Sequence, residues 1–217
     1  MTIVKICGLT DIGSAITAAE AGADLLGMVF AMSRRCVTPD WARSIADAVR
    51  QTHSKSLLTG VFVNLPAVEV NRLAEYCGLD RVQLSGHESW EYCREIERPV
   101  IKVVHVTENA QAREMLHEIE QGCRILKKES VCLLDTQTDN SFGGTGKTFN
   151  WKIAIEIAAR FPVYIAGGLT PDVVGDLVQK VKPAGVDVSG GIETDGRKDF
   201  NKIKAFIKAV READSKK

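Results

Sequence analysis

Two residues of this chain combine an ionisable side chain with a position at the end of an apolar run. Cys7 ends a run that begins at Ile3, and Asp135 ends a run that begins at Val131. A thiol near a positive charge can lose its proton near neutrality, and Lys5 lies on the same side of the expected strand as Cys7. A buried carboxylic acid must be hydrogen-bonded or functional. The pair therefore offers an acid and a base, although a buried cysteine is more often simply a small apolar residue.

Two glycine pairs follow the last two apolar runs of the chain. They are Gly167-Gly168 and Gly190-Gly191, and the second pair is preceded by Ser189. Unencumbered backbone N–H groups at such turns suit a phosphate, above all where a helix begins. Tight turns that require positive φ explain one glycine pair easily, but they explain both pairs less well. We therefore expect a phosphorylated ligand at these turns.

The loop after Asp135 is polar and rich in glycine, with Gly144 and Gly146 near its centre. A nucleotide-binding P-loop requires glycine five positions before Gly146, where this chain has Ser141. The dinucleotide-binding pattern fails as well, because Phe149 stands where its last glycine belongs. The loop is thus interpreted as a flexible segment that supplies backbone amides next to an acid.

The elements that position these residues alternate regularly along the chain. No run shows a clean two-residue alternation, so each strand is expected to be buried on both faces, as parallel strands covered by helices are. Strands are expected at residues 3–7, 24–30, 57–63, 81–84, 100–105, 131–135, 163–166 and 185–188. Helices are expected at residues 11–21, 39–49, 67–76, 90–95, 110–120, 151–159, 171–181 and 200–212.

Eight such units favour an α/β fold of the (β/α)₈ TIM-barrel type, and we expect residues 1–217 to form a single catalytic domain. The rival architecture is an open doubly wound sheet, which is built from the same units but does not need eight of them. In a barrel the loops after the strands meet at one face, where active sites are found. Cys7, Asp135 and both glycine turns would then surround one site.

Composition excludes several classes of protein. The chain has 28 basic and 28 acidic residues, spread so that no basic stripe favours binding to nucleic acid or to a membrane surface. No apolar run approaches the ~18 residues of a membrane helix, and no signal peptide is expected because the first strand is predicted to begin at Thr2 or Ile3. Six cysteines without C-x-x-C spacing indicate a reducing, cytoplasmic location. The four histidines, His53, His87, His105 and His117, show no metal-ligand spacing, so neither a metal nor a cofactor is expected.

An acid and a base without metal or cofactor indicate an isomerase that moves protons on a small phosphorylated molecule. Two alternatives stay open on these grounds, a barrel enzyme of another sugar phosphate and a barrel that binds phosphates without turnover. The sequence is compatible with either a monomer or a homodimer.

The same residues resemble the phosphoribosylanthranilate isomerase family, which acts in tryptophan biosynthesis. The resemblance runs in order from residue 4 to Lys198-Asp199 and covers nearly the whole chain. The matching segments are Val4-Lys5-Ile6-Cys7-Gly8-Leu9-Thr10, Ser33-Arg34-Arg35-Cys36-Val37-Thr38-Pro39, Gly60-Val61-Phe62-Val63-Asn64, Val82-Gln83-Leu84, Leu133-Leu134-Asp135, Gly143-Gly144-Thr145-Gly146, Ala166-Gly167-Gly168-Leu169-Thr170-Pro171 and Val186-Asp187-Val188-Ser189.

This resemblance implies an Amadori rearrangement of N-(5-phosphoribosyl)anthranilate to carboxyphenylamino-deoxyribulose phosphate. It implies that Asp135 is the general acid that protonates the ribose ring oxygen, and that Cys7 is the general base that removes the C2 proton. Arg35 is then the partner of the anthranilate carboxylate. The implied substrate-binding set also includes the loop and turn residues Gly144, Gly146, Gly167, Gly168, Ser189 and Gly190.

The chain departs from the family pattern at two positions. Ser85 stands where the family usually has the histidine of Val-Gln-Leu-His-Gly, and His87 follows two residues later. Gly190 stands where the family usually has a second serine, which should cost little if backbone amides hold the phosphate. The mechanism implied above assigns both proton transfers to other residues, so we expect activity to survive the change at Ser85.

Overall fold

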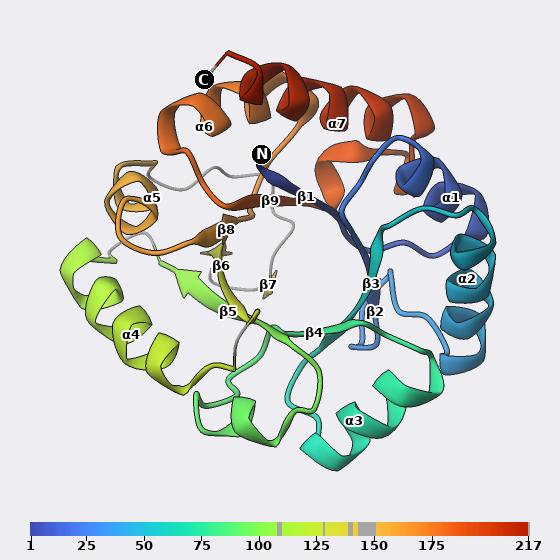
Figure 1. Ribbon diagram of the computed structural model, residues 1–217, viewed down its shortest axis with the longest axis horizontal. Helices are drawn as coiled ribbons and strands as arrows, with labels where there is room; N and C mark the ends of the chain where they lie inside the picture. The colour runs from blue at the N-terminus through green and yellow to red at the C-terminus, as the bar shows by residue number, and fades with distance from the viewer. Residues whose placement is uncertain (108–109, 128, 139–140, 143–150, 217) are drawn as a thin grey trace.

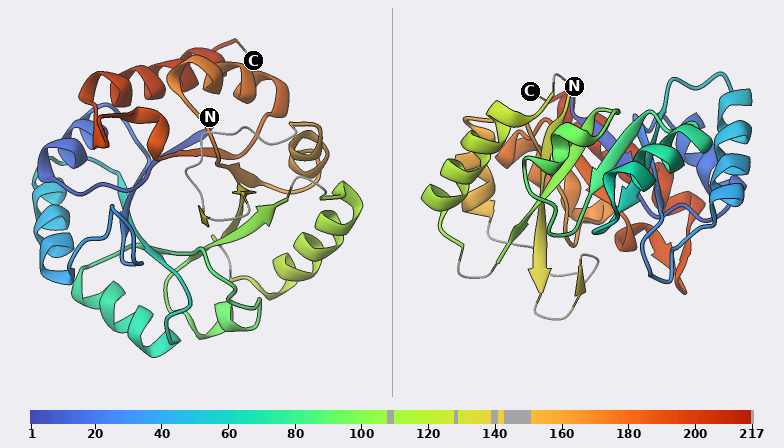
Figure 2. Two further views of the ribbon diagram at one scale, coloured as in Figure 1. Left: turned by 180° about the vertical axis from the view of Figure 1, so that it is seen from behind. Right: turned by 90° about the horizontal axis from the view of Figure 1, so that it is seen from below.

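The computed structural model is a closed ring of parallel strands surrounded by helices, which confirms the predicted barrel (Figures 1 and 2). It describes residues 1–216 except 108–109, 128, 139–140 and 143–150. The barrel strands are β1 (Ile3–Ile6), β2 (Leu25–Val29), β3 (Leu57–Phe62), β4 (Arg81–Leu84), β5 (Val100–Val106), β6 (Val131–Thr138), β8 (Val163–Ile165) and β9 (Gly185–Val188). Each strand pairs in parallel with the next along the chain, and β9 closes the ring on β1.

The outer ring is made of α-helices that begin at residues suited to helix starts. Thr38 caps α2 by accepting a hydrogen bond from Trp41 N at 3.3 Å, and Pro39 occupies the first turn, as predicted. The helices of the described part of the chain are α1 (Ile12–Glu20), α2 (Pro39–Gln51), α3 (Ala67–Tyr76), α4 (Ala112–Ile125), α5 (Trp151–Ala158), α6 (Pro171–Val181) and α7 (Phe200–Asp214).

The prediction of a helix at residues 90–95 is wrong. The segment between β4 and β5 forms only the short 3₁₀-helix η1 (Tyr92–Glu95). Gly86 and Pro99 lie near the two ends of the segment, which offers too few apolar residues at helical spacing to cover the barrel as a full helix. The other predicted helices and strands are present, with ends that differ by a few residues.

Four short elements that the sequence did not predict lie beyond the carboxyl ends of the barrel strands. The strand β7 (Ser141–Phe142) pairs antiparallel with β6. After β9 the chain forms the 3₁₀-helix η2 (Gly190–Ile192) and then a small antiparallel hairpin of β10 (Glu193–Thr194) and β11 (Arg197–Lys198). This hairpin adds charged side chains to the end of the barrel where β9 finishes.

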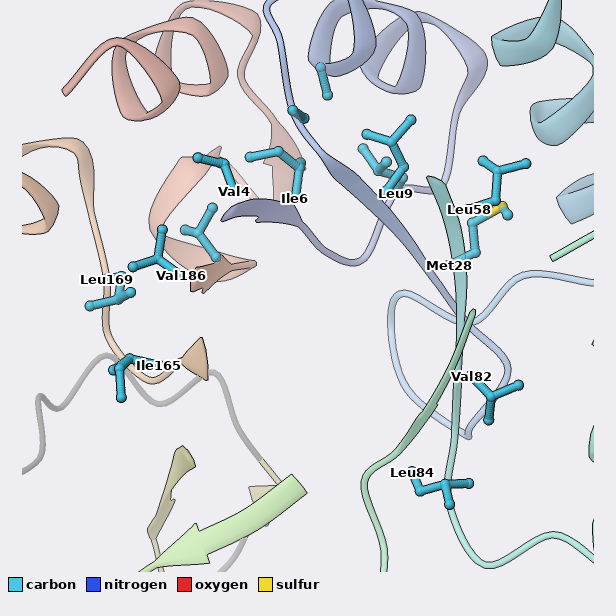
Figure 3. Close-up of a cluster of buried hydrophobic side chains, with 14 of the residues drawn as sticks. Val4, Ile6, Leu9, Met28, Leu58, Val82, Leu84, Ile165, Leu169 and Val186 are labelled. Carbon is cyan, nitrogen blue, oxygen red and sulfur yellow. The ribbon is translucent and has the colours of Figure 1, made fainter. Parts of the chain in front are cut away.

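The hydrophobic core has two parts, because alternate residues of each strand point to opposite faces. Outward residues such as Val4, Ile6 and Met28 belong to a large cluster that also contains residues of the surrounding helices (Figure 3). Inward residues such as Leu25 and Leu133 form a smaller cluster inside the barrel. Strands buried on both faces are what the lack of alternation predicted.

Within the described part of the chain, no helix is both long enough and apolar enough to cross a membrane.

Candidate active site

A cavity of about 740 Å³ opens where the barrel strands end. Side chains from opposite sides of the ring line it, among them Cys7 after β1, Asp135 on β6 and Ser189 after β9. The turn that carries Gly167 and Gly168 lines it as well. The sequence placed these residues at strand ends on the assumption of a barrel, and the closed ring brings them to one cavity.

Cys7 lies at the bottom of this cavity with 7% of its surface exposed. Its backbone N–H donates to Val188 O at 2.8 Å, which fixes the end of β1 against the end of β9. Burial raises the pKa of the Cys7 thiol, and this effect outweighs the nearby Lys5 ammonium, which lowers it. The thiol is therefore protonated at neutral pH in the substrate-free site, in contrast to the near-neutral pKa expected for the base.

Asp135 is half-buried and faces the same cavity from β6. It is the direct neighbour of His105 in the register of β5 and β6, and both lie on the inward face. Burial lowers the pKa of His105, so its imidazole is neutral at neutral pH. The predicted binding residues Gly144 and Gly146 lie outside the described residues.

The two glycine turns after β8 and β9 touch each other. Gly167 and Gly168 have φ of +93° and +65°, a backbone conformation that side chains rarely allow. Gly191 is required for a different reason, because a Cβ there would lie 1.8 Å from Leu169 O. Ser189 and Gly190 follow β9 directly and line the cavity beside these turns.

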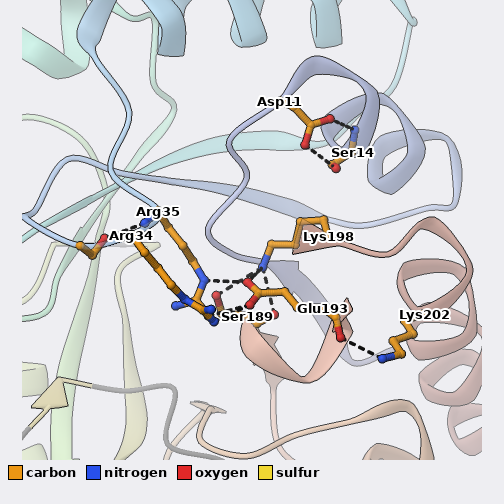
Figure 4. A network of polar contacts seen from close by, with 9 residues as sticks. Asp11, Ser14, Arg34, Arg35, Ser189, Glu193, Lys198 and Lys202 are labelled. Atoms are coloured by element: carbon orange, nitrogen blue, oxygen red, sulfur yellow. Dashed lines mark hydrogen bonds and ion pairs between the residues drawn. The ribbon is translucent and has the colours of Figure 1, made fainter. Parts of the chain in front are cut away.

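Arg35 reaches the cavity from the loop between β2 and α2, and its side chain crosses Gly8. Its Nε donates to Glu193 Oε1 at 2.7 Å and a terminal nitrogen donates to Oε2 at 3.0 Å (Figure 4). Arg34 and Lys198 also form ion pairs with Glu193, at 2.6 Å and 3.1 Å. One edge of the Arg35 guanidinium is thus held by an internal carboxylate, which the sequence did not predict.

Glu193 and Lys198 come from the hairpin β10–β11 and are almost completely buried. Lys198 also donates to Ser189 O at 2.9 Å, so the hairpin is connected to the turn after β9. Burial alone would raise the pKa of Glu193, but the neighbouring Arg35 and Lys198 hold it below its usual value. The cluster carries more positive than negative groups and faces the side of the cavity where the glycine turns lie.

Ser85, the position that departs from the family pattern, lines the cavity after β4. Its hydroxyl accepts a hydrogen bond from Gln83 Nε2 at 3.0 Å, and its carbonyl accepts one from His105 Nε2 at 3.1 Å. His87 does not line the cavity. The imidazole nearest to this position therefore comes from the neighbouring strand β5. Its inward position at the end of a predicted strand was the signal that could have identified it.

In the described part of the chain, no group of three or more histidine, cysteine or acidic side chains is arranged to hold a metal ion.

The sequence matches the family described as N-(5'phosphoribosyl)anthranilate (PRA) isomerase over residues 4–209. The chain belongs to this family of isomerases. Membership confirms the expected activity class, the isomerisation of phosphoribosylanthranilate in tryptophan biosynthesis.

Individual phosphoribosylanthranilate isomerases match along their whole length. The enzyme of Dehalococcoides mccartyi is 49% identical over 214 residues, which cover 99% of this chain and 98% of that protein. The crystal structure of the enzyme of Thermotoga maritima superposes with a TM-score of 0.84 at 37% identity, covering 98% of this chain and 100% of the other. Another isomerase structure, in complex with reduced 1-(o-carboxyphenylamino)-1-deoxyribulose 5-phosphate, has a TM-score of 0.80 at 34% identity with the same coverage.

Proposed function

We propose that the chain isomerises N-(5'-phosphoribosyl)anthranilate with Asp135 as general acid and Cys7 as general base. The observation that carries this assignment is that both side chains face one cavity from different strands, beside the two glycine turns. A cavity of about 740 Å³ is in the usual range for a small-molecule site, roughly 300–1,000 Å³.

The reaction begins with the opening of the ribose ring. The Asp135 carboxylic acid gives its proton to the ring oxygen, the bond between that oxygen and C1 breaks, and the anilino nitrogen lone pair forms an iminium with C1. The iminium acidifies the hydrogen at C2. Cys7 first gives its own thiol proton to solvent, and the resulting thiolate then removes the C2 proton. The electrons of the C2–H bond form the double bond of an enolamine as the π electrons of the iminium return to nitrogen.

The enolamine then becomes the ketone when C1 gains a proton and the C2 hydroxyl loses one. The steps need no redox change, so two titratable groups at opposite sides of the sugar suffice.

The substrate has two anionic groups, and the cavity offers a place for each. The phosphate binds the backbone amides of the turns that carry Gly167, Gly168, Ser189 and Gly190. The anthranilate carboxylate binds Arg35, on the guanidinium edge that Glu193 does not occupy. A ligand with both anionic groups is supported by the isomerase relative that was solved in complex with reduced 1-(o-carboxyphenylamino)-1-deoxyribulose 5-phosphate. The same proposal includes Gly144 and Gly146, which follow Asp135 in the sequence, as residues that contact the substrate.

We also infer a cytoplasmic location, because all six cysteines are free thiols.

The decisive experiment is an assay of the purified protein that follows the loss of phosphoribosylanthranilate fluorescence. Cys7→Ala and Asp135→Asn should each reduce kcat/KM by ~10²–10⁴-fold, the usual contribution of a positioned acid or base. Cys123→Ala on α4 and Asp47→Asn on α2 are matched controls, because they make the same chemical changes at exposed positions away from the cavity.

Either active-site variant that kept more than about half of the wild-type kcat/KM, with chemistry shown to limit the rate, would exclude that residue from its proton-transfer role.

A further inference from the structure

A lysine and an aspartate form an ion pair inside the barrel, where Asp187 is one of the residues that line the cavity and Lys5 is fully buried. Lys5 Nζ lies 3.0 Å from Asp187 Oδ1, and the side chains are 0% and 9% exposed. The two residues are direct neighbours in the register of β1 and β9. A buried ion pair stabilises a fold poorly, because its desolvation cost rivals its attraction and apolar residues of similar size often serve as well. Nearby interior positions such as Leu25 and Leu133 are in fact apolar.

The Lys5 ammonium of this ion pair lies close to the thiol of Cys7. A Cβ placed on Gly27 would lie 2.9 Å from Cys7 Sγ and 3.1 Å from Lys5 Nζ. The sulfur and the ammonium nitrogen are therefore no farther apart than the sum of these distances. This is within the range of about 4–6 Å over which an opposite charge shifts a pKa by 1–3 units. Gly27 leaves room for both groups.

We propose that the Lys5–Asp187 pair sets the ionisation of Cys7, with the Lys5 ammonium stabilising the thiolate and the Asp187 carboxylate opposing it. This inference rests on the proposed function, in which Cys7 is the base. Lys5 is a positioning residue here, because it acts on the substrate through the thiol, whereas Asp187 also lines the cavity.

The directions of the individual effects agree with this arrangement. Burial raises the pKa of Cys7, Lys5 lowers it by its charge and by hydrogen bonding, and Asp187 raises it. Burial lowers the pKa of Lys5, but Asp187 and Cys7 together raise it by a larger amount. The ammonium therefore keeps its proton throughout the neutral range. When the thiolate forms, it therefore meets a permanent cation on one side. In the resting site the Asp187 carboxylate balances the charge of Lys5, which favours the protonated thiol of Cys7.

Other charged groups face the cavity from other elements. Lys198 on β11 also lowers the pKa of Cys7, but its charge is shared with Glu193 at 3.1 Å. Arg35 is engaged by the same glutamate, and His105 and Asp135 face the cavity from β5 and β6. Lys5 differs from all of these because it is fully buried, so salt screens its effect on the thiol only weakly.

The test measures the reaction of Cys7 with iodoacetamide as a function of pH, without substrate, with each cysteine resolved by peptide mass spectrometry. Only the thiolate reacts, so the rate reports its population. At pH 7, Lys5→Met should slow alkylation of Cys7 by about tenfold or more, and Asp187→Asn should accelerate it by about tenfold. The exposed thiol of Cys36 is the internal reference for the reagent.

Matched controls come from an exposed ion pair of the same type. Lys180 and Asp176 on α6 lie 2.9 Å apart at the surface, so Lys180→Met and Asp176→Asn should leave the Cys7 profile unchanged. If Lys5→Met fails to fold by circular dichroism, Asp187→Asn decides, because it preserves shape and the sign of its effect is opposite.

Shifts of less than about twofold in both variants, or shifts of the same sign, would overturn the proposal. The same variants separate it from the proposed function. If the alkylation profile moves and the pH profile of kcat/KM moves with it, both stand. If alkylation moves while the kcat/KM profile does not, the control of the thiol is supported and Cys7 is excluded as the base.

Discussion

Gly191→Ala tests the phosphate site without touching a proton-transfer residue. Gly191 lies in the turn after β9 and faces the turn after β8, where a Cβ would come within 1.8 Å of Leu169 O. Real Cβ atoms essentially never approach closer than 3.0 Å, so the two turns must separate by about 1.2 Å or more, the difference between these values. The neighbour is backbone, so it cannot give way by a side-chain rotation.

A displacement of this size is enough to break a hydrogen bond. A bond of about 2.9 Å that lengthens by that amount leaves the normal range of 2.7–3.2 Å. A hydrogen bond to a charged group contributes about 1.5–3 kcal/mol. Since about 1.4 kcal/mol corresponds to tenfold in affinity, the loss of one such bond should raise KM by at least about tenfold. The turnover number should change little, because the phosphate carries no reacting atom and is bound alike in the substrate and in the transition state.

The measurements are KM for phosphoribosylanthranilate, inhibition by inorganic phosphate, and thermal unfolding. Overpacking should also destabilise the fold by about 1–3 kcal/mol. Gly175→Ala on α6 is the matched control, because its Cβ would meet only Ala209 O at 3.7 Å, an ordinary contact. This control should stabilise the helix by roughly 0.5–1 kcal/mol and leave KM unchanged. A folded Gly191→Ala protein with wild-type KM and wild-type phosphate inhibition would place the phosphate elsewhere.

Two further predictions concern Ser85 and Glu193. Ser85→His should change kcat/KM by no more than about tenfold in either direction. The reason is that the Ser85 hydroxyl accepts one hydrogen bond from Gln83, worth ~0.5–1.5 kcal/mol. An inactive wild-type protein that gained activity with histidine at this position would show that the imidazole is indispensable. The pKa of Glu193 is lowered in the folded protein, so its contribution to stability is present above its ordinary pKa of 4.5 and is lost as pH falls through the lower, folded value. Glu193→Gln should therefore weaken the dependence of Tm on pH below 4.5, and equal slopes for both proteins would contradict this.

The sequence predicted the barrel well because the same physical constraint acts on every strand. A parallel strand buried on both faces is a short apolar run, and β4 and β9 were predicted with the correct ends. Residues 90–95 misled the prediction because a short apolar spacing with charged neighbours is shared by helices and irregular turns. The register of the barrel then places Cys7 and Asp135 at its mouth without further information.

The ionic part of the site could not be predicted in this way. Arg35 and Glu193 are 158 positions apart in the sequence, and nothing in a single chain states which acid meets which base. The hairpin that carries Glu193 and Lys198 consists of two-residue strands, too short to give a hydrophobic pattern. His105 is an intermediate case, because its strand was predicted but its contact with the Ser85 carbonyl depends on how β4 and β5 pair.

Lys5 and Lys198, the two buried lysines of the site, offset an electrostatic cost of the proposed binding mode. In that mode the phosphate binds at the turn after β9, and the end of β9 is joined to Cys7 by the hydrogen bond from Cys7 N–H to Val188 O. The phosphate charge opposes formation of the thiolate, since like charges at short range raise the pKa of a thiol. Lys198 donates to Ser189 O in the turn after β9, whereas Lys5 lies close to the sulfur inside the barrel. One cation at the turn proposed to hold the phosphate and one at the thiol would allow the same cavity to bind an anion and to generate a second one.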